Sequence, residues 1–274
     1  MCMKKALTIA GSDSGGGAGI QADLKTFQEL DVFGMSALTA VTAQNTLGVH
    51  AVYPMTAEAV VKQIEAIGED IGADAVKTGM LFNAEIIEAV AAQLRNYQWQ
   101  NVVVDPVMIA KGGASLLQME AISAMKKYLL PLATVITPNI PEAEVLTGMS
   151  ILNVEDKLES AKRLHALGVK NVVIKGGHDE NESESTDLLF DGKEFYYFTS
   201  KRILTKNTHG TGCTFSAVIT AELAKGETLY EAVCIAKDFI QAAIENHLEI
   251  GQGHGPTNHW AYQKRKIAKE LAEL

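Results

Sequence analysis

The sequence lacks any apolar run approaching the ~20 residues that are needed to cross a bilayer. The apolar segment after the basic start Met1–Lys5 ends at Gly11–Asp13, so it is too short and too soon polar for a secretory signal. We therefore expect a cytoplasmic protein that has no membrane partner.

Cysteine and positive charge are also scarce. The three cysteines, Cys2, Cys213 and Cys234, are odd in number and lack metal-ligand spacing, which predicts neither a disulfide framework nor a zinc site. The formal net charge of -9 argues against a nucleic-acid partner, because phosphate backbones are bound by clustered Lys and Arg. Internal repeats and low-complexity linkers are absent, so residues 1–274 are predicted to form a single domain.

What the sequence does contain is a regular alternation of two patterns. Hydrophobic residues make up 47% of the chain and charged residues 21%, as in ordinary globular proteins. Short β-branched runs predict parallel strands at 6–10, 38–43, 75–78, 102–105, 135–137 and 172–175. Segments of helical period lie between them, for example 19–30, 57–67, 84–94 and 155–167, the last capped by Gly168. Strands separated by helices require crossovers, so we expect an α/β fold with a mostly parallel central sheet and helices on both faces.

The pattern changes in the last third of the chain. Asp191-Gly192 stands between the apolar runs 187–190 and 194–198, which predicts a β-hairpin at one edge of the sheet, since such a turn needs a positive φ. Residues 179–185 are acidic and are predicted to form a solvated loop. Two helices, at about 213–225 and 229–249, are predicted to close the chain.

Ligands of open parallel sheets bind beyond the carboxyl ends of the strands. Most of the residues at these predicted strand ends are glycine or polar, as expected of a binding site: Gly11–Gly19, Gln44, Gly79–Met80, Asp105–Pro106, Pro138–Asn139 and Lys175–Gly177.

The first glycine-rich segment, Gly11–Gly19, would let the backbone approach a ligand ahead of a helix whose first N–H groups are free. It is not a Walker loop, because no Lys-Ser/Thr pair follows it. It also does not fit G-x-G-x-x-G, which disfavours a Rossmann oxidoreductase. A tight strand-to-helix turn without a ligand is the alternative interpretation.

The second glycine-rich segment, Asn207–Phe215, directly precedes an apolar helix. Gly210 and Gly212 would let successive N–H groups converge into an anion-binding nest, which stabilises charge on a transferred phosphoryl group. Cys213 would lie at the positive end of the helix, where the pKa of a thiol is lowered. The alternative is a glycine-rich helix entry with a buried, inert cysteine.

Residues 208–215 resemble the anion-hole signature of ribokinase-like kinases, with Cys213 where most members carry Asp. The branch with cysteine at this place contains the hydroxymethylpyrimidine kinases of thiamine biosynthesis and their pyridoxal-phosphorylating relatives. Further motifs resemble that branch, in the same order along the chain: 10–23, 39–45, 77–80, 104–108, 137–144 and 174–178. The resemblance covers residues 6 to about 260. It implies a ribokinase-like fold and ATP-dependent phosphorylation of 4-amino-5-hydroxymethyl-2-methylpyrimidine and of its monophosphate.

The resemblance also implies roles for individual residues. Gln44 would pair with the aminopyrimidine, since a carboxamide offers both a donor and an acceptor. Cys213 would accept or relay the proton of the substrate hydroxymethyl group. Further predicted site residues are Asp23, Met80, Val107 and Gly11 around the substrate, and Gly210, Thr211 and Gly212 around the γ-phosphate.

At the nucleotide end, the resemblance implies that Lys175, Asn139 and Thr208 bind ATP, and that Asp105 and Glu142 hold Mg²⁺, partly through waters. Simpler interpretations are open for three residues. Gln44 could be a solvated strand end, and Asp23 and Glu142 could complement helix dipoles without any ligand.

Other functions are also open. A pyridoxal kinase, or an enzyme that accepts both rings, is the nearest alternative; Gln44 favours the aminopyrimidine, because pyridoxal has no exocyclic amine to pair with it. A binding module without turnover is disfavoured by Cys213, Lys175 and Glu142. The family implies a homodimer. Residues 253–259 resemble its C-terminal motif, and their two histidines are predicted to lie in a loop rather than a metal site.

Overall fold

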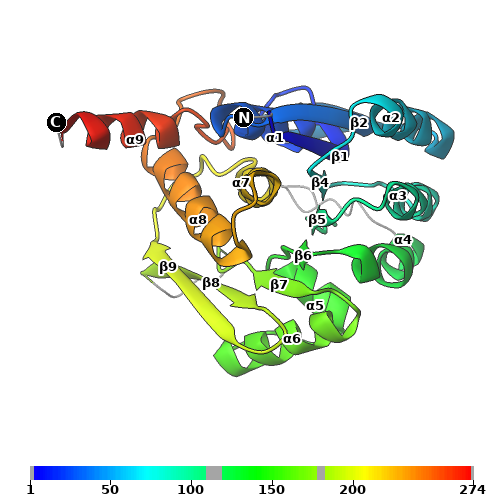
Figure 1. Cartoon of the computed structure of the whole chain (residues 1–274). Helices are drawn as coiled ribbons and strands as arrows, with labels where there is room; N and C mark the ends of the chain where they lie inside the picture. Colours follow the sequence, from blue (N-terminus) through cyan, green and yellow to red (C-terminus); the bar gives the residue numbers. More distant parts are fainter. Residues whose placement is uncertain (1–2, 109–118, 178–182, 273–274) are drawn as a thin grey trace.

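The computed structural model describes residues 3–108, 119–177 and 183–272, which contain one nine-stranded sheet of order β3-β2-β1-β4-β5-β6-β7-β8-β9 (Figure 1). Every pair from β2 to β7 in that order is parallel, and the outer pairs β2–β3, β7–β8 and β8–β9 are antiparallel. The strands are β1 Lys5–Asp13, β2 Phe33–Asn45, β3 Gly48–Pro54, β4 Ala75–Thr78, β5 Asn101–Val104, β6 Val135–Ile136, β7 Asn171–Ile174, β8 Glu184–Phe190 and β9 Phe195–Lys201.

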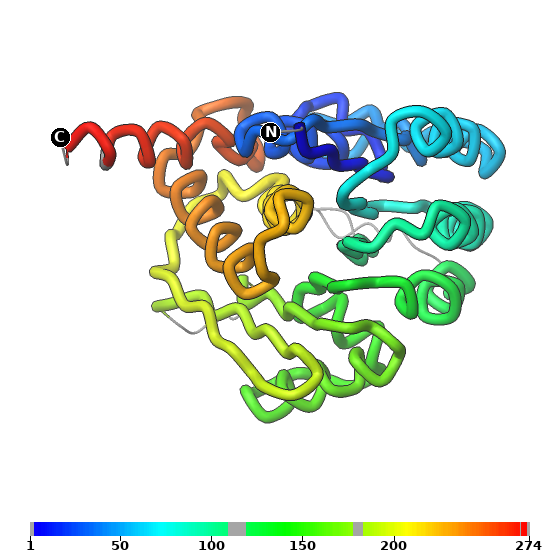
Figure 2. The backbone as a smooth tube through the Cα atoms, viewed as in Figure 1, coloured from blue at the N-terminus to red at the C-terminus, as the bar shows by residue number. Residues whose placement is uncertain are grey.

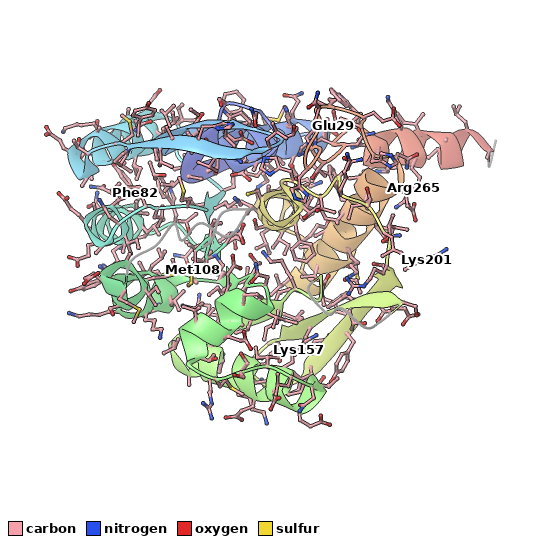
Figure 3. The ribbon with its side chains drawn as sticks, turned by 180° about the vertical axis from the view of Figure 1, so that it is seen from behind. Glu29, Phe82, Met108, Lys157, Lys201 and Arg265 are labelled. Atoms are coloured by element: carbon pink, nitrogen blue, oxygen red, sulfur yellow. The ribbon has the colours of Figure 1, made fainter. Side chains whose placement is uncertain are left out.

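Helices cover both faces of the sheet. On one face lie α1 Gly19–Glu29, α7 Thr211–Lys225 and α8 Leu229–Glu245, with α9 Ala261–Ala272 packed on α8. On the other lie α2 Ala57–Asp70, α3 Ala84–Tyr97, α4 Met119–Ala124, α5 Ile140–Thr147 and α6 Val154–Ala166. Helix α4 continues into π-helical η1 Met125–Leu129 and 3₁₀-helical η2 Leu130–Leu132. Seen from behind, Phe82 lies near the start of α3 and Lys157 lies on α6 (Figure 3).

The alternation of side chains along each strand explains the two layers. Ala75 and Val103 pack against α1, α7 and α8, whereas their neighbours Val76 and Val102 belong to the core on the opposite face. Both sets are buried, which is why the central strands read as continuous apolar runs in the sequence.

The fold class, the six parallel strands and the hairpin are confirmed, and Gly192 in the hairpin turn has φ +92°. β1 and β2 are longer than predicted: β1 continues to Asp13 at its carboxyl end, whereas β2 already begins at Phe33 and continues to Asn45. Strand β8 takes up Glu184 and Ser185 of the predicted loop, while residues 179–182 lie outside the described residues.

The prediction that two helices close the chain is wrong. Helix α8 ends at Glu245 rather than at 249, and α9 follows, projecting beyond the sheet (Figure 2). Helix α9 is held by stacking of Tyr262 on Phe239 of α8, with ring centroids 5.2 Å apart. In the described part of the chain, no helix is both long enough and apolar enough to span a membrane.

Candidate active site

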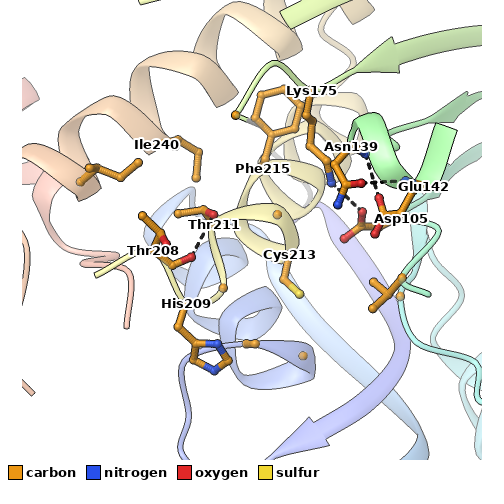
Figure 4. A pocket seen from close by; sticks show the side chains of 18 of the residues that line it. Asp105, Asn139, Glu142, Lys175, Thr208, His209, Thr211, Cys213, Phe215 and Ile240 are labelled. Carbon is orange, nitrogen blue, oxygen red and sulfur yellow. Dashed lines mark hydrogen bonds and ion pairs between the residues drawn. The ribbon is translucent and has the colours of Figure 1, made fainter. Parts of the chain in front are cut away.

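A cavity of about 640 Å³ opens at the carboxyl ends of the parallel strands, next to the first turn of α7 (Figure 4). The predicted site residues that line it are Gly11, Gln44, Met80, Asp105, Val107, Asn139, Glu142, Lys175, Thr208, Gly210, Thr211, Gly212 and Cys213. The tertiary structure thus brings together residues from seven separate segments of the chain. Asp23 is the exception, and it lies buried and away from the cavity lining.

The start of α7 depends on a left-handed glycine. Gly210 is the N-cap with φ +84°, and a Cβ there would overlap the carbonyl oxygen of Gly17 in the first glycine-rich loop. The helix begins at Thr211, two residues earlier than predicted, so Gly212 and Cys213 belong to its first turn. N–H groups of a first turn have no acceptor within the helix and attract anions. The cavity therefore contains a site suited to a phosphate group.

The pKa of the Cys213 thiol differs from the prediction. Burial is the main cause of a pKa raised to about 11; Lys77 and the Gly19 N–H oppose the shift, and the nearby Asp23 and Asp105 add to it. The expected lowering at a helix start is wrong here, because desolvation of the thiolate outweighs the field of the helix end. Cys213 is therefore a protonated thiol at neutral pH.

Lys77 was not identified as a site residue from the sequence. Its Nζ lies 2.9 Å from Asp23 Oδ2, both side chains are fully buried, and the Thr8 hydroxyl donates to the same oxygen at 2.6 Å. Burial lowers the pKa of Lys77, but Asp23, Cys213 and Asp105 raise it by more, so the amine stays charged. Asp23 thus holds a cation that lines the cavity near the thiol. The sequence feature that could have identified Lys77 is its place in the fully buried strand β4, because a buried charge requires a partner.

Two carboxylates and a lysine lie together at the other end of the cavity. Lys175 Nζ is 3.0 Å from Asp105 Oδ1, and the Ser216 hydroxyl donates to Asp105 Oδ2 at 3.2 Å. Glu142 and Asn139 form a capping box at the start of α5, in which each side chain accepts from the other's backbone N–H, at 2.8 and 2.9 Å. Burial raises the pKa of Glu142 to about 7; Lys175 opposes this shift and Asp105 adds to it.

The donor set at Asp105 and Glu142 fits Mg²⁺, which prefers carboxylate oxygens and keeps several of its waters. A cation there would relieve the repulsion between the two carboxylates that contributes to the raised pKa of Glu142. Among the described residues, His, Cys, Asp and Glu form no cluster of three or more that could enclose a metal. The residues therefore suit a cation shared with a phosphate ligand rather than one caged by protein.

Gln44, Met80 and Val107 also line the cavity. Gly11 leaves room for Met80, because a Cβ on Gly11 would overlap the Met80 methyl group. The Thr39 hydroxyl donates to the Met80 carbonyl at 2.6 Å and fixes that segment. These residues form an apolar wall beside one carboxamide, which suits a flat heterocycle.

His209 connects the two glycine-rich loops. Its Nε2 lies 2.8 Å from Asp13 Oδ2 and 3.3 Å from Gln44 Nε2. Asp13 also accepts backbone N–H bonds from Gly15, Gly17 and Ala18. Although burial raises the pKa of Asp13, the His209 contact and these N–H bonds lower it by more, so Asp13 is a carboxylate.

Residues 253–259 support the same loop from outside. The His209 N–H donates to the Gly255 carbonyl, and Thr257 donates to the His209 carbonyl through both its N–H and its hydroxyl. His259 Nε2 lies 3.0 Å from the Thr214 hydroxyl, and burial lowers the pKa of His259 to about 4. This segment therefore positions the loop ahead of α7, a role that the sequence did not reveal.

Comparison with known proteins agrees with this geometry. The family model for phosphomethylpyrimidine kinase matches residues 13–258. The chain is 58% identical over 267 residues to a hydroxymethylpyrimidine/phosphomethylpyrimidine kinase of Bacillus subtilis, covering 97% of this chain and 98% of that protein. It is 60% identical over 266 residues to the enzyme of that name from Haemophilus influenzae, covering 96% and 98%.

Two solved structures are also similar. A Bacillus subtilis pyridoxal kinase in complex with ADP has a TM-score of 0.89 and 47% identity, covering 96% of this chain and 100% of that one. A pyridoxal kinase from Staphylococcus aureus in complex with AMP-PCP and pyridoxal has a TM-score of 0.89 and 43% identity, covering 96% of each chain.

Proposed function

The chain belongs to the phosphomethylpyrimidine kinase family, and we propose that it transfers the γ-phosphoryl group of ATP to the hydroxymethyl group of 4-amino-5-hydroxymethyl-2-methylpyrimidine, and then to the resulting monophosphate, for thiamine biosynthesis. One observation carries the proposal. A single cavity places Cys213 and the first turn of α7 between His209 on one side and Asp105 with Glu142 on the other (Figure 4). An alcohol and a nucleotide can therefore meet at the helix start.

The first turn of α7 would hold the γ-phosphate. Gly212 and Cys213 line the cavity in the first helical turn, where N–H groups have no acceptor inside the helix, and Lys175 adds a positive charge close to Gly212. Because these groups are already in place, they stabilise charge on the transferred group without reorganisation. Asn139 and Thr208 line the adjoining part of the cavity, where we place the nucleotide.

Cys213 would relay a proton. Since its pKa is about 11, the thiol rests protonated. As the hydroxymethyl oxygen forms its bond to the γ-phosphorus and the bond to ADP breaks, Sγ takes the hydroxyl proton while the S–H proton passes to a phosphoryl oxygen. Lys77 stabilises the transient negative charge on sulfur, and Asp23 keeps Lys77 in place.

Asp105 and Glu142 would hold Mg²⁺, with Glu142 oriented by its capping box with Asn139. When bound, this ion neutralises charge that develops on the phosphates during transfer. At the other end, Gln44 would pair with the ring nitrogen and exocyclic amine of the pyrimidine. Met80 would pack on the ring face.

Steady-state assays with ATP and three acceptors test the proposal: the pyrimidine alcohol, its monophosphate and pyridoxal. We expect ADP release with both pyrimidines and a lower kcat/KM with pyridoxal. Pyridoxal kinase is the second candidate, because two similar structures are of pyridoxal kinases. ADP release with pyridoxal but not with the pyrimidine alcohol would replace the proposal by that candidate, and a lack of turnover with every acceptor would leave a binding module.

The homodimer implied by the family stays a prediction. Light scattering coupled to size-exclusion chromatography measures the mass in solution, and a mass twice that of the 29.5 kDa chain is expected.

A further inference from the structure

The hydrogen on His209 is fixed by its neighbour Asp13. Asp13 Oδ2 already accepts the N–H groups of Gly17 at 3.0 Å and Ala18 at 2.8 Å, and His209 Nε2 lies 2.8 Å from it. A carboxylate oxygen brings no proton to such a contact, so Nε2 must carry a hydrogen and donate it. The other tautomer would set a lone pair of nitrogen against a negative oxygen.

The same N–H decides which atom of the Gln44 amide can face it. One end of that amide lies 3.3 Å from His209 Nε2. If this end is the amide nitrogen, two N–H groups point at each other. If it is the oxygen, it accepts the weaker branch of the N–H that His209 shares with Asp13. The contact to Asp13 is shorter and charge-assisted, so it sets the tautomer, and Gln44 must adapt by turning its oxygen toward His209.

Thr42 leads independently to the same orientation. Its hydroxyl donates its single hydrogen to the Ser12 carbonyl at 2.9 Å. Thr42 Oγ1 also lies 3.2 Å from the other end of the Gln44 amide. With its hydrogen already used, this oxygen can only accept there, so the amide nitrogen belongs on the Thr42 side. Both neighbours therefore require the same rotation of Gln44.

We propose that Asp13, acting through His209, locks the Gln44 amide with its oxygen toward His209 and its nitrogen toward Thr42, and that this orientation selects rings carrying a hydrogen-bond donor next to the reacting hydroxymethyl group. Asp13 and His209 are thus positioning residues that determine specificity. The inference rests on the proposed function, whose substrate preference it explains.

The geometry of the pyrimidine fits this orientation. The free lone pair of the Gln44 oxygen accepts from the 4-amino group, and the free N–H of the amide donates to ring nitrogen N3. Because His209 directly precedes the Gly210–Cys213 turn, the amino group lies on the side of that turn. The hydroxymethyl group is the ortho neighbour of the amino group, opposite N3, so it extends toward Cys213. The reverse amide orientation would turn the hydroxymethyl group away from the thiol.

Rings with an acceptor at that place are disfavoured. Pyridoxal carries its aldehyde oxygen next to the hydroxymethyl group, so two acceptors would face each other. The 4-oxo analogue of the pyrimidine is a sharper probe, because it has the same shape but exchanges both groups: an acceptor at C4 and a donor at N3. We expect the protein to prefer the 4-amino ring over the 4-oxo ring by about 100-fold or more in kcat/KM, since a mismatch leaves buried polar groups unpaired.

The test compares this ratio in wild type, His209→Gln and His209→Phe. The glutamine variant keeps an N–H that can donate to Asp13 and should keep most of the preference. The phenylalanine variant keeps a ring but has no donor, so Thr42 alone still holds the amide and rotation to match the other substrate costs less. We expect its preference to fall by about 10-fold or more, mainly through a gain with the 4-oxo ring. Thermal melting and ADP affinity of each variant check that the fold and the nucleotide end are intact.

Thr42→Val gives a second route if His209→Phe does not fold, because it removes the acceptor at the nitrogen end of the amide and should also reduce the preference. The inference would be overturned if folded His209→Phe kept the wild-type ratio, or, should that variant not fold, if folded Thr42→Val kept it. A wild type that does not distinguish the two rings would also overturn it. In these cases turnover of the 4-amino ring persists, so the proposed function stands; a loss of that turnover in wild type would instead remove the proposed function.

Discussion

Replacing Glu142 by glutamine is expected to stabilise the ligand-free protein at alkaline pH while impairing the kinase. Glu142 is only 6% exposed, and burial together with Asp105 raises its pKa to about 7 against the opposing effect of Lys175. Glutamine has the same shape and can still accept the Asn139 N–H in the capping box. The substitution therefore removes the charge and leaves the start of α5 intact.

The magnitude follows from the pKa. A carboxyl group whose pKa is raised by folding binds its proton more tightly in the folded state than in the unfolded chain. Its contribution to stability is complete below pH 4.5 and is lost as the pH rises to about 7. The difference between pKa 4.5 and about 7 corresponds to about 3 kcal/mol. Glu142→Gln is thus expected to match wild type near pH 4.5 and to exceed it by up to about 3 kcal/mol at pH 8.

Urea denaturation at several pH values between 4.5 and 9, without nucleotide or metal, measures the free energy of unfolding for both proteins. Glu231 offers a matched control, because it is an exposed acid at the corresponding position of α8, where the Thr228 hydroxyl and N–H lower its pKa. Its stabilising contribution is lost as pH falls, so Glu231→Gln should show a pH trend of opposite sign.

A stability difference between wild type and Glu142→Gln that does not change with pH would refute the reasoning, because it would mean that the carboxyl group titrates as in the unfolded chain. The same variant should raise the Mg²⁺ concentration for half-maximal rate by about 10-fold or more, as expected for a carboxylate that helps to hold the ion. An unchanged Mg²⁺ requirement would remove Glu142 from the metal site.

Cys213→Ala should lower kcat by about 100-fold with little change in KM. Because a proton relay needs no standing thiolate, kcat of the wild type should also be independent of pH between pH 8 and 10. A thiolate base with a pKa of about 11 would instead raise kcat by about tenfold per pH unit. Lys77→Met should cost about 3–5 kcal/mol in urea denaturation by leaving Asp23 buried without its partner, and adding Asp23→Leu should recover most of that loss. Gly210→Ala should destabilise the protein by at least about 2 kcal/mol more than Gly226→Ala, since both positions have positive φ but only the former meets another loop; equal losses in thermal or urea unfolding would contradict the tight packing of the loops.

Much of the fold is local information and could therefore be predicted from the sequence. Doubly buried strands such as β4 and β5 are short apolar runs, and the turn at Asp191-Gly192 needs a residue that accepts positive φ. Helix α9 was missed in the sequence; it is held chiefly by Tyr262 on Phe239, while its larger apolar residues Ile267 and Leu271 are exposed.

The candidate site was largely predictable because glycine motifs and strand ends mark it in the sequence. What only the tertiary structure decided are the energies and orientations within it. Sequence position places Cys213 at a helix start, but its pKa depends on how much water the packed loops exclude, and that burial outweighs the helix end. The partnership of Lys77 with Asp23 and that of His209 with Asp13 join residues 54 and 196 positions apart, respectively. Such contacts exist only once the chain has folded, because charge and hydrogen-bond geometry depend on distance in space rather than along the sequence.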